Sequence, residues 1–256
     1  MSRREYGAAG LVGILPPQAN TTVEAELGVL LEPDVALLVS RLVCHEQQSR
    51  ARLLGYFHNV EASLRAFDSA KPDTVLFACT GSTYLTGLEE EQRKLAPLGV
   101  ISAARAVRDA LDALKAKRIA LVSPYPPWLT QACVAFWGAQ GREIAEVQVP
   151  AGEREDTRRI YALGSADALH ALERIRPSAV DAVLITGTGM PSLAALAQAR
   201  LPVPLLSSNL CLAWAAARAL KGAAPDRASL EPWLAGDAAW KARLESRFPS
   251  LSGAPR

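Results

Sequence analysis

One cysteine stands in a segment whose residue types suit chemistry. Cys79 follows a short apolar run, and directly after it come Thr80, Gly81 and Ser82. Hydroxyl groups and free backbone N–H groups at the start of a helix bind anions, and the positive end of the helix dipole lowers the pKa of a thiol. We interpret Cys79 as a reactive thiolate and the three residues after it as an anion-binding loop. The alternative is a small buried cysteine at the end of a strand, which is common in intracellular proteins.

Polar residues also follow the first apolar run of the chain. Asn20 and Thr21 come shortly after Pro17, and either of them is a good N-cap for the helix expected next. A cap accounts for one polar residue more easily than for several. We therefore also expect Asn20 and Thr21, with Pro17 beside them, to help hold a carboxylate.

A tyrosine between prolines is the third candidate. Tyr125 lies in the sequence Ser-Pro-Tyr-Pro-Pro, at the end of another apolar run. The neighbouring prolines restrict the backbone, so the Tyr125 hydroxyl could donate to an oxyanion or take part in a proton transfer. The alternative is a partly buried loop tyrosine with no chemical role.

The chain contains an internal repeat with an offset of 108 residues. Residues 73–85 align without a gap on residues 181–193, with Asp, Val, Leu, Thr, Gly and Leu at shared positions. The second copy carries Gly187, Thr188 and Gly189 where the first copy carries the cysteine loop. The repeat therefore predicts two equivalent loops, of which the second lacks the thiol.

Short apolar runs alternate with longer segments of helical spacing. The runs are rich in Val, Leu and Ile without polar alternation, which is typical of parallel strands buried on both faces. The expected strands are residues 10–15, 35–39, 74–78, 100–102, 118–123, 144–149, 182–186 and 203–207. The expected helices include residues 46–67, 83–96, 103–116, 129–140, 156–176 and 229–248.

Strand–helix alternation together with the repeat predicts an α/β protein made of two similar lobes. The first lobe is expected at residues 1–110 and the second at 111–218, with residues 219–256 packing back on the first. Ligands of open parallel sheets bind beyond the carboxyl ends of the strands. The site is therefore expected between the two lobes.

Several segments together resemble the aspartate/glutamate racemase superfamily, and within it the maleate cis-trans isomerases and arylmalonate decarboxylases most. The matching segments are residues 13–26, 78–82, 123–125, 189–193 and 207–209, in order over nearly the whole chain. The resemblance implies two flavodoxin-like lobes, each a four-stranded parallel sheet with helices on both faces, related by pseudo-twofold internal duplication. It also implies chemistry without a metal or an organic cofactor.

Residue roles follow from the resemblance position by position. It implies that Asn20 binds a substrate carboxylate and that Cys79 is the thiol of the first lobe. It implies further that Thr80 and Gly81 contribute to an oxyanion site and that Tyr125 contacts the substrate.

The second lobe departs from the superfamily pattern. Racemases carry a second thiol directly before the segment Thr188-Gly189-Met190, and this chain has Gly187 there. Thr188, Gly189 and Met190 remain candidates for lining the site. Cys211 could replace the missing thiol, but the superfamily motif has a helix-packing residue at that position.

The resemblance leaves three reactions open. Racemases use two cysteines on opposite faces of the α-carbon, maleate isomerases form a thioether with the alkene, and arylmalonate decarboxylases protonate an enediolate with one cysteine. We expect a cofactor-independent enzyme of the maleate isomerase type that acts on a small dicarboxylate through Cys79. A decarboxylase with Cys79 as sole proton donor, an amino-acid racemase and a non-enzymatic carboxylate-binding protein are the alternatives.

Composition limits the other function classes. The 256 residues carry a net charge of +2 with scattered basic residues, which gives no reason to expect nucleic-acid binding. No apolar run is long enough to span a bilayer. The cysteines form no CxxC pair and the three histidines do not cluster, so neither a zinc site nor a disulfide framework is expected. A cytoplasmic location is expected, and a homo-oligomer is left open.

Overall fold

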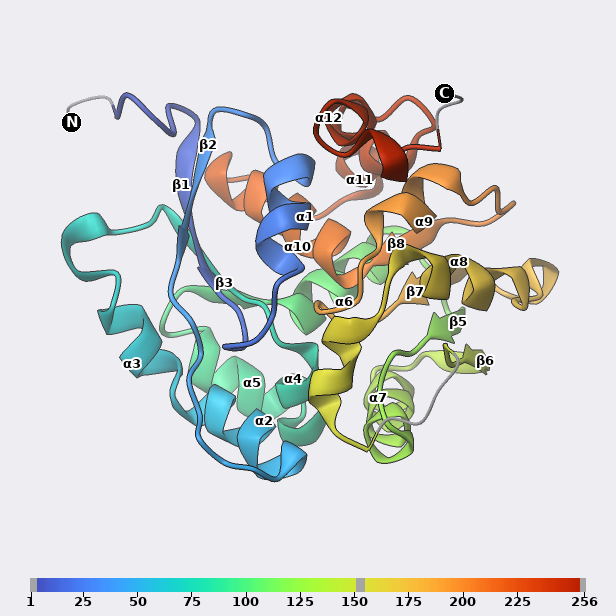
Figure 1. Ribbon diagram of the computed structural model, residues 1–256, viewed down its shortest axis with the longest axis horizontal. Coiled ribbons are helices and arrows are strands. Elements are labelled where there is room, and N and C mark those ends of the chain that lie inside the picture. The colour runs from blue at the N-terminus through green and yellow to red at the C-terminus, as the bar shows by residue number, and fades with distance from the viewer. Residues whose placement is uncertain (1–3, 151–154, 254–256) are drawn as a thin grey trace.

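Two parallel sheets form the framework of the molecule (Figure 1). The computed structural model describes residues 4–150 and 155–253. The first sheet contains β1 Gly10–Leu15, β2 Val35–Val39, β3 Thr74–Phe77 and β4 Val100–Ser102, and the second contains β5 Arg118–Val122, β6 Glu143–Gln148, β7 Ala182–Ile185 and β8 Leu205–Ser207. Their strand orders are β2-β1-β3-β4 and β6-β5-β7-β8. The predicted α/β fold with two four-stranded parallel sheets is confirmed, and each sheet defines one lobe.

Helices follow most of the strands, as expected for parallel sheets that need crossover connections. The α-helices are α1 Val23–Leu30, α2 Ser49–His58, α3 Val60–Arg65, α4 Thr80–Thr86, α5 Leu88–Leu95, α6 Ala103–Ala113, α7 Pro127–Ala139, α8 Ser165–Glu173, α9 Leu193–Gln198, α10 Ser208–Leu220, α11 Arg227–Leu234 and α12 Ala239–Arg247. Short 3-10 turns are η1 Asp68–Ala70, η2 Thr157–Ala162, η3 Pro177–Ala179 and η4 Pro249–Leu251. Within the described ranges, no helix is long and apolar enough to cross a membrane.

The repeat in the sequence corresponds to the same backbone contact in both lobes. Asp73 accepts a hydrogen bond from the Leu11 N–H at 2.7 Å, and its own N–H donates to the Leu11 carbonyl at 2.8 Å. Asp181 makes the same two bonds with the backbone of Arg118, at 2.8 and 2.7 Å. Asp73 thus joins the start of β3 to the start of β1, and Asp181 joins the start of β7 to the start of β5. This shared role explains why aspartate occurs in both copies.

Four segments expected as single helices are interrupted. The segment 229–248 divides into α11 and α12, because Ala235 is extended with a ψ of 153°. The segment 46–67 divides into α2 and α3 at Asn59, whose φ and ψ are −87° and 5°. The segment 83–96 divides at Gly87, whose φ of +82° suits glycine and ends a helix. The segment 156–176 is the turn η2 followed by α8, because Leu163 and Gly164 are extended. These expectations were wrong because apolar spacing does not show a local break.

Helices from distant parts of the chain connect the lobes. Helix α10, which follows β8, packs against α6, which follows β4, and also against α1 (Figure 1). Helix α4 of the first lobe packs against α7 of the second. After α10 the chain returns to the first lobe, where α12 packs on α1 and α11 on α6. The ends of the central strands therefore lie between two lobes that are packed together.

Candidate active site

The candidate site residues follow four strands, two from each lobe, and hydrogen bonds join them across the lobes. The Thr188 hydroxyl donates to the carbonyl of Ala78, beside Cys79, at 2.7 Å. The Asn20 amide donates to Thr188 Oγ1 at 3.3 Å. Thr80 Oγ1 and the hydroxyl of Tyr125 lie 2.5 Å apart. The structure therefore brings the polar loops of the two lobes together.

Cys79 is buried at the N-cap of α4, and its side chain is held as a thiol. The residue is 4% exposed, and its Sγ lies 3.1 Å from Ser82 Oγ. Ser82 donates its own proton to the Leu53 carbonyl at 2.6 Å, so its oxygen is free to accept the S–H proton. Burial raises the pKa of Cys79, and hydrogen bonds from Ser82 and the Gly81 N–H only partly oppose it. This direction is opposite to the one expected from the helix dipole.

Asn20 combines a structural role with a place beside the site. Its Oδ1 accepts hydrogen bonds from the N–H groups of Thr22 at 2.9 Å and Val23 at 3.2 Å, and so stabilises the turn before α1. The N-cap itself is Thr22, and not Asn20 or Thr21 as expected. The amide N–H₂ of Asn20 is left to contact the second lobe. Thr21, in contrast, is exposed and does not line the cavity described below.

An arginine holds the turn that carries Asn20. Arg41 donates to the Asn20 carbonyl at 2.5 Å and forms a two-bond ion pair with Glu24 at 2.5 and 2.6 Å. Its charge is therefore compensated within the protein. The Arg41 side chain positions this turn and is not a free cation for a substrate.

A small cavity of about 40 Å³ lies between the lobes. The predicted residues that line it are Pro17, Cys79, Thr80, Gly81, Tyr125, Thr188 and Gly189. The sequence analysis missed the other lining residues, which are Arg52, Leu53, Tyr56, Leu129, Thr157, Arg158, Ile160 and Tyr161. Most of these come from α2 and η2, inside segments that were interpreted as uninterrupted helices. No motif in the sequence marked them.

The position of the missing second thiol is filled by neighbouring side chains. Gly187 has a φ of +92°, and a Cβ there would lie 2.9 Å from Pro124 Cγ, 3.1 Å from the Tyr125 hydroxyl and 3.2 Å from Ile160 Cδ1. Burial raises the pKa of Tyr125 well above its ordinary value, so its hydroxyl is a proton donor at neutral pH. A phenol thus lies beside the place where a second thiol would be.

Known proteins resemble this chain in sequence and in fold. The profile of the Asp/Glu/hydantoin racemase family matches residues 35–216. The chain belongs to this family. It is 28% identical to the maleate isomerase of Nocardia farcinica over 227 residues, which are 82% of this chain and 89% of that protein.

Solved structures of family members have the same fold. A structure of the Nocardia farcinica maleate cis-trans isomerase, a Cys-to-Ser variant with a covalently bound succinylcysteine intermediate, has a TM-score of 0.71 and 26% identity. The match covers 82% of this chain and 92% of that one. Arylmalonate decarboxylase has a TM-score of 0.68 at 21% identity, covering 84% and 94% of the two chains, and this likeness concerns the fold alone.

The remaining cysteines do not line the cavity between the lobes. Cys211 is fully buried within α10, where burial raises its pKa, and it does not line the cavity. Met190 is also fully buried and outside the lining. Cys133 lies in α7, and burial raises its pKa to about 12. Over residues 4–150 and 155–253, no three His, Cys, Asp or Glu side chains gather as a metal-binding group.

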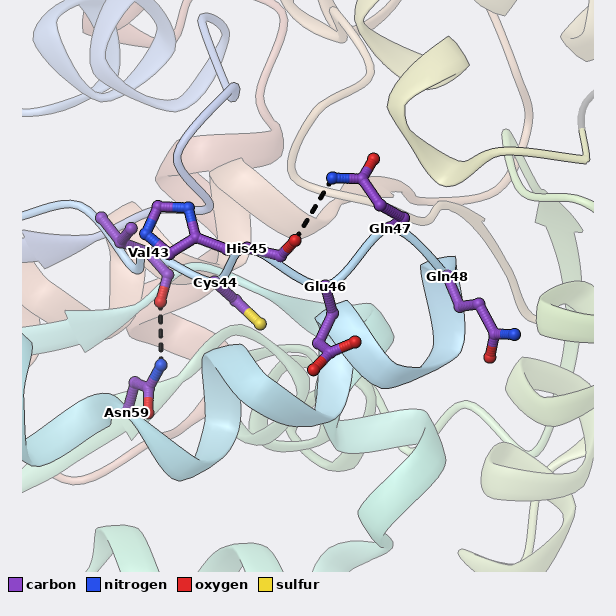
Figure 2. A pocket seen from close by; sticks show the side chains of 7 residues that line it. All are labelled: Val43, Cys44, His45, Glu46, Gln47, Gln48 and Asn59. Atoms are coloured by element: carbon purple, nitrogen blue, oxygen red, sulfur yellow. Dashed lines mark hydrogen bonds between the residues drawn. The ribbon is translucent and has the colours of Figure 1, made fainter.

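A wider hollow of about 780 Å³ lies beside the loop between β2 and α2 (Figure 2). Its lining includes Cys44, whose side chain points toward α2, where a Cβ at Gly55 would lie 2.3 Å from its sulfur. Gly55 therefore makes room for the buried thiol. The side chains of His45 and Glu46 point away from one another in Figure 2, so they do not form an acid–base pair.

Proposed function

We propose that this chain catalyses cis–trans isomerisation of a small unsaturated dicarboxylate such as maleate, with Cys79 as nucleophile and without a cofactor. The observation that carries the proposal is the buried Cys79 thiol, which lines a cavity between the lobes opposite Tyr125 and Thr188. The similarity to maleate isomerases over most of the chain supports the choice of substrate class.

The proposed reaction makes the double bond temporarily single. The Cys79 sulfur bonds to one alkene carbon, and the other carbon takes a proton from the Tyr125 hydroxyl. Tyr125 recovers a proton from the Cys79 thiol, so the net change is addition of S–H across the double bond. Rotation about the new single bond, followed by loss of the same sulfur and proton, releases the trans isomer.

The polar groups around Cys79 have distinct parts in this scheme. Thr80, hydrogen-bonded to Tyr125, orients the phenol. The Thr188 hydroxyl donates to the Ala78 carbonyl and accepts from the Asn20 amide, so it holds that amide in place. The second N–H of the Asn20 amide is suited to bind one substrate carboxylate, and the backbone N–H of Gly81 is suited to an oxyanion. Because these donors are fixed by the fold, they need little reorganisation when negative charge develops.

One thiol is sufficient for this route, which is consistent with Gly187. The structure of the Nocardia farcinica enzyme carries a succinylcysteine adduct although one cysteine is replaced by serine. Racemisation through two thiols would need a second group in place of the one missing at position 187.

The test is to incubate the protein in deuterated water with maleate, an arylmalonate, aspartate or glutamate, and to follow each by proton NMR. We expect fumarate to form from maleate, and intact-mass measurement to detect an adduct with the mass of one maleic acid. Carboxylate binding without any conversion would instead identify a binding protein.

The contribution of Cys79 is tested by replacing it. We expect Cys79→Ala to lower turnover by about a thousandfold or more, as removal of a nucleophile does in other enzymes, with the fold intact. Cys211→Ala is the matched control, because Cys211 is buried but lies outside the cavity. Normal turnover of Cys79→Ala, or an equal loss in both variants, would contradict this assignment.

A second candidate reaction is decarboxylation of a substituted malonate. It is favoured by the raised pKa of Cys79, since a neutral thiol is a proton donor. Loss of carbon dioxide would leave an enediolate, the Cys79 S–H proton would bond to its α-carbon, and water would restore the thiol. Carbon dioxide release from the arylmalonate in the same NMR experiment distinguishes this reaction.

A further inference from the structure

Two tyrosine hydroxyl groups at the cavity have no hydrogen-bond partner among the described residues. They belong to Tyr56 of α2, in the first lobe, and Tyr161 of η2, in the second, and both residues line the cavity. The other two tyrosines at the lobe interface are paired, Tyr84 with Thr186 at 2.6 Å and Tyr125 with Thr80 at 2.5 Å.

The Tyr56 hydroxyl is open to the cavity although the residue as a whole is buried. Tyr56 is 4% exposed and lines the cavity, and its oxygen is not among the fully buried polar atoms that lack a partner. Burial, with a smaller contribution from nearby Cys79, raises the pKa of Tyr56 to about 12, so it is a neutral donor at physiological pH. A donor that faces the cavity and has no protein partner is available to a ligand that supplies the acceptor.

The Tyr161 ring is held in place by the second-lobe loop. A Cβ at Gly189 would lie 2.6 Å from Tyr161 Cε1 and 3.0 Å from its Cδ1, so the ring packs directly on the glycine. Burial also raises the pKa of Tyr161, which keeps it a donor. The two phenols therefore approach one cavity from different lobes, each on a fixed element.

Both arginines that line this end of the cavity are already paired. Arg52 donates to Asp156 at 2.7 Å and to the Gln47 carbonyl at 2.8 Å, and Arg158 donates to Asp156 from Nε at 2.8 Å. Both guanidinium groups add positive potential but are committed to protein acceptors. The two phenols are therefore the aromatic donors at this end that can bind an anion directly.

We propose that Tyr56 and Tyr161 form a second carboxylate subsite, in which their two O–H groups donate to the substrate carboxylate that the Asn20–Thr188 side does not bind. The inference rests on the proposed function in one respect, namely that the ligand is a dicarboxylate. This subsite selects for a diacid over a monoacid. A monoacid bound through its one carboxylate at the Asn20–Thr188 side has no second carboxylate to accept from the two tyrosine O–H groups. The Tyr56–Tyr161 subsite also binds the lobes together through the substrate.

The experiment measures protection of Cys79 from iodoacetamide, which does not require turnover. Alkylation at Cys79 is quantified by peptide mass spectrometry with increasing succinate, a saturated diacid, or butyrate, a monoacid of the same chain length. In the wild type we expect succinate to protect at a concentration about tenfold or more below that of butyrate. Tyr56→Phe and Tyr161→Phe should each raise the half-protecting succinate concentration about tenfold and leave the butyrate value unchanged.

Tyr6→Phe is the matched control, because Tyr6 is 81% exposed and does not line the cavity. It should behave as the wild type with both acids. Circular dichroism and the thermal midpoint confirm that each variant is folded. Equal shifts for succinate and butyrate, or no shift for either, would overturn the Tyr56–Tyr161 subsite.

The same variants separate this inference from the proposed function. If maleate is not converted but succinate protection depends on both tyrosines, the subsite stands and the isomerase proposal fails. If maleate is converted with KM unchanged in Tyr56→Phe and Tyr161→Phe, and succinate protection is also unchanged, the isomerase proposal stands and the subsite fails.

Discussion

At the scale of single residues, the site depends on a thiol that stays protonated and a glycine that excludes a second thiol. Cys79 is neutral because burial outweighs the hydrogen bonds that would stabilise its thiolate. Gly187 cannot simply be replaced by cysteine, because its backbone and its neighbours leave no room. Both properties follow from the surroundings of the residue and have direct tests.

The protonation state of Cys79 predicts the pH dependence of its alkylation. Its pKa lies above the ordinary value of 9.0, so the reactive thiolate fraction increases about tenfold per pH unit below that pH. We expect the iodoacetamide rate at Cys79 to rise from pH 6 to pH 9 without levelling off. Glutathione in the same buffers is the reference, and a plateau between pH 6 and 8 would show a lowered pKa instead.

Placing a cysteine at position 187, where racemases carry their second thiol, should lower the stability of the protein. Gly187→Cys places a Cβ 2.9 Å from Pro124 Cγ at a φ of +92°, and we expect the free energy of unfolding to fall by about 2 kcal/mol. Urea denaturation measures this. Gly138→Ala is the control, since nothing lies within 4 Å of a Cβ there. An equally stable Gly187→Cys that exchanges the α-proton of aspartate would contradict the prediction.

The amino-acid sequence predicted some of the residues that line the cavity and missed others. Cys79 and Tyr125 were found because a polar residue at the end of an apolar run is conspicuous. Tyr56 and Tyr161 were missed because a tyrosine in a helical pattern resembles any core aromatic. Their significance lies in hydroxyls that lack partners, which only the folded arrangement reveals.

At the scale of elements, the turn η2 connects the second lobe to the first across the cavity. Asp156, directly before η2, accepts hydrogen bonds from Arg52 at 2.7 Å and from Ser49 at 3.2 Å, both on α2. The Thr157 N–H also donates to Ser49 Oγ at 3.2 Å. These bonds keep Ile160 and Tyr161 over the site, which is consistent with a cavity of only about 40 Å³.

Weakening this connection should expose Cys79. A side-chain hydrogen bond from Arg158 and the charge of Arg52 hold the pKa of Asp156 well below its usual range. For an acid with a lowered pKa, the stabilisation is complete above the unfolded-state pKa of about 4 and is lost only as the pH falls below it. We therefore expect Asp156→Asn to increase Cys79 alkylation at pH 8 by about threefold to tenfold.

The control for Asp156→Asn is Glu143→Gln, which removes an exposed ion pair with Arg118. It should leave the alkylation rate unchanged. A rate unchanged in Asp156→Asn as well would mean that the η2 connection does not limit access to the thiol.

The strands were predicted more accurately than the helices for a physical reason. Buried parallel strands need continuous branched apolar residues, so β1 and β2 were predicted at their observed bounds. Helix breaks depend on single dihedral angles such as those of Asn59 and Gly87. A sequence pattern averaged over several turns does not detect them.

At the scale of the whole molecule, Glu26 joins the two lobes near the site. Glu26, in α1, accepts hydrogen bonds from the backbone N–H and hydroxyl of Ser192, from the Leu193 N–H at 3.1 Å and from the Asn209 amide at 2.8 Å. Asn209 also donates to the Thr188 carbonyl at 3.1 Å. The carboxylate thus supports the loop that carries Thr188.

Replacing Glu26 should weaken the contact between the lobes. Glu26→Gln puts an amide N–H₂ where these donors need an acceptor, and we expect the free energy of unfolding to fall by about 2–4 kcal/mol. Urea denaturation measures the loss. Glu32→Gln is the control, because the Glu32 side chain is 62% exposed in its pair with Arg243.

The Glu26 carboxyl also predicts a pH dependence of stability. Burial raises its pKa above 4.5, so the folded state binds a proton more readily than the unfolded state. Stability contributed by this proton is present below 4.5 and is lost as the pH rises through the folded-state value. The wild type should show this decline and Glu26→Gln should not. The same slope in both proteins would assign it to another group.

The duplication was visible in the sequence, but the bonds between its halves were not. An offset of 108 residues relates Asp73 to Asp181, which have the same backbone role. Glu26 and Asn209 lie 183 residues apart and belong to no shared pattern. Contacts of this separation arise from the packing of complete lobes.

The unequal lobes have a stereochemical consequence. Among the described residues that line the cavity, Cys79 is the only thiol, and it lies on the first lobe. If the decarboxylation named above as the second candidate takes place, a planar enediolate between the lobes would receive the Cys79 proton on the face turned toward the first lobe. A product with a new stereocentre would then form as one enantiomer, and an enzyme with its thiol on the other lobe would give the mirror image. Because position 187 is glycine, the two faces of such an intermediate would not meet equivalent proton donors.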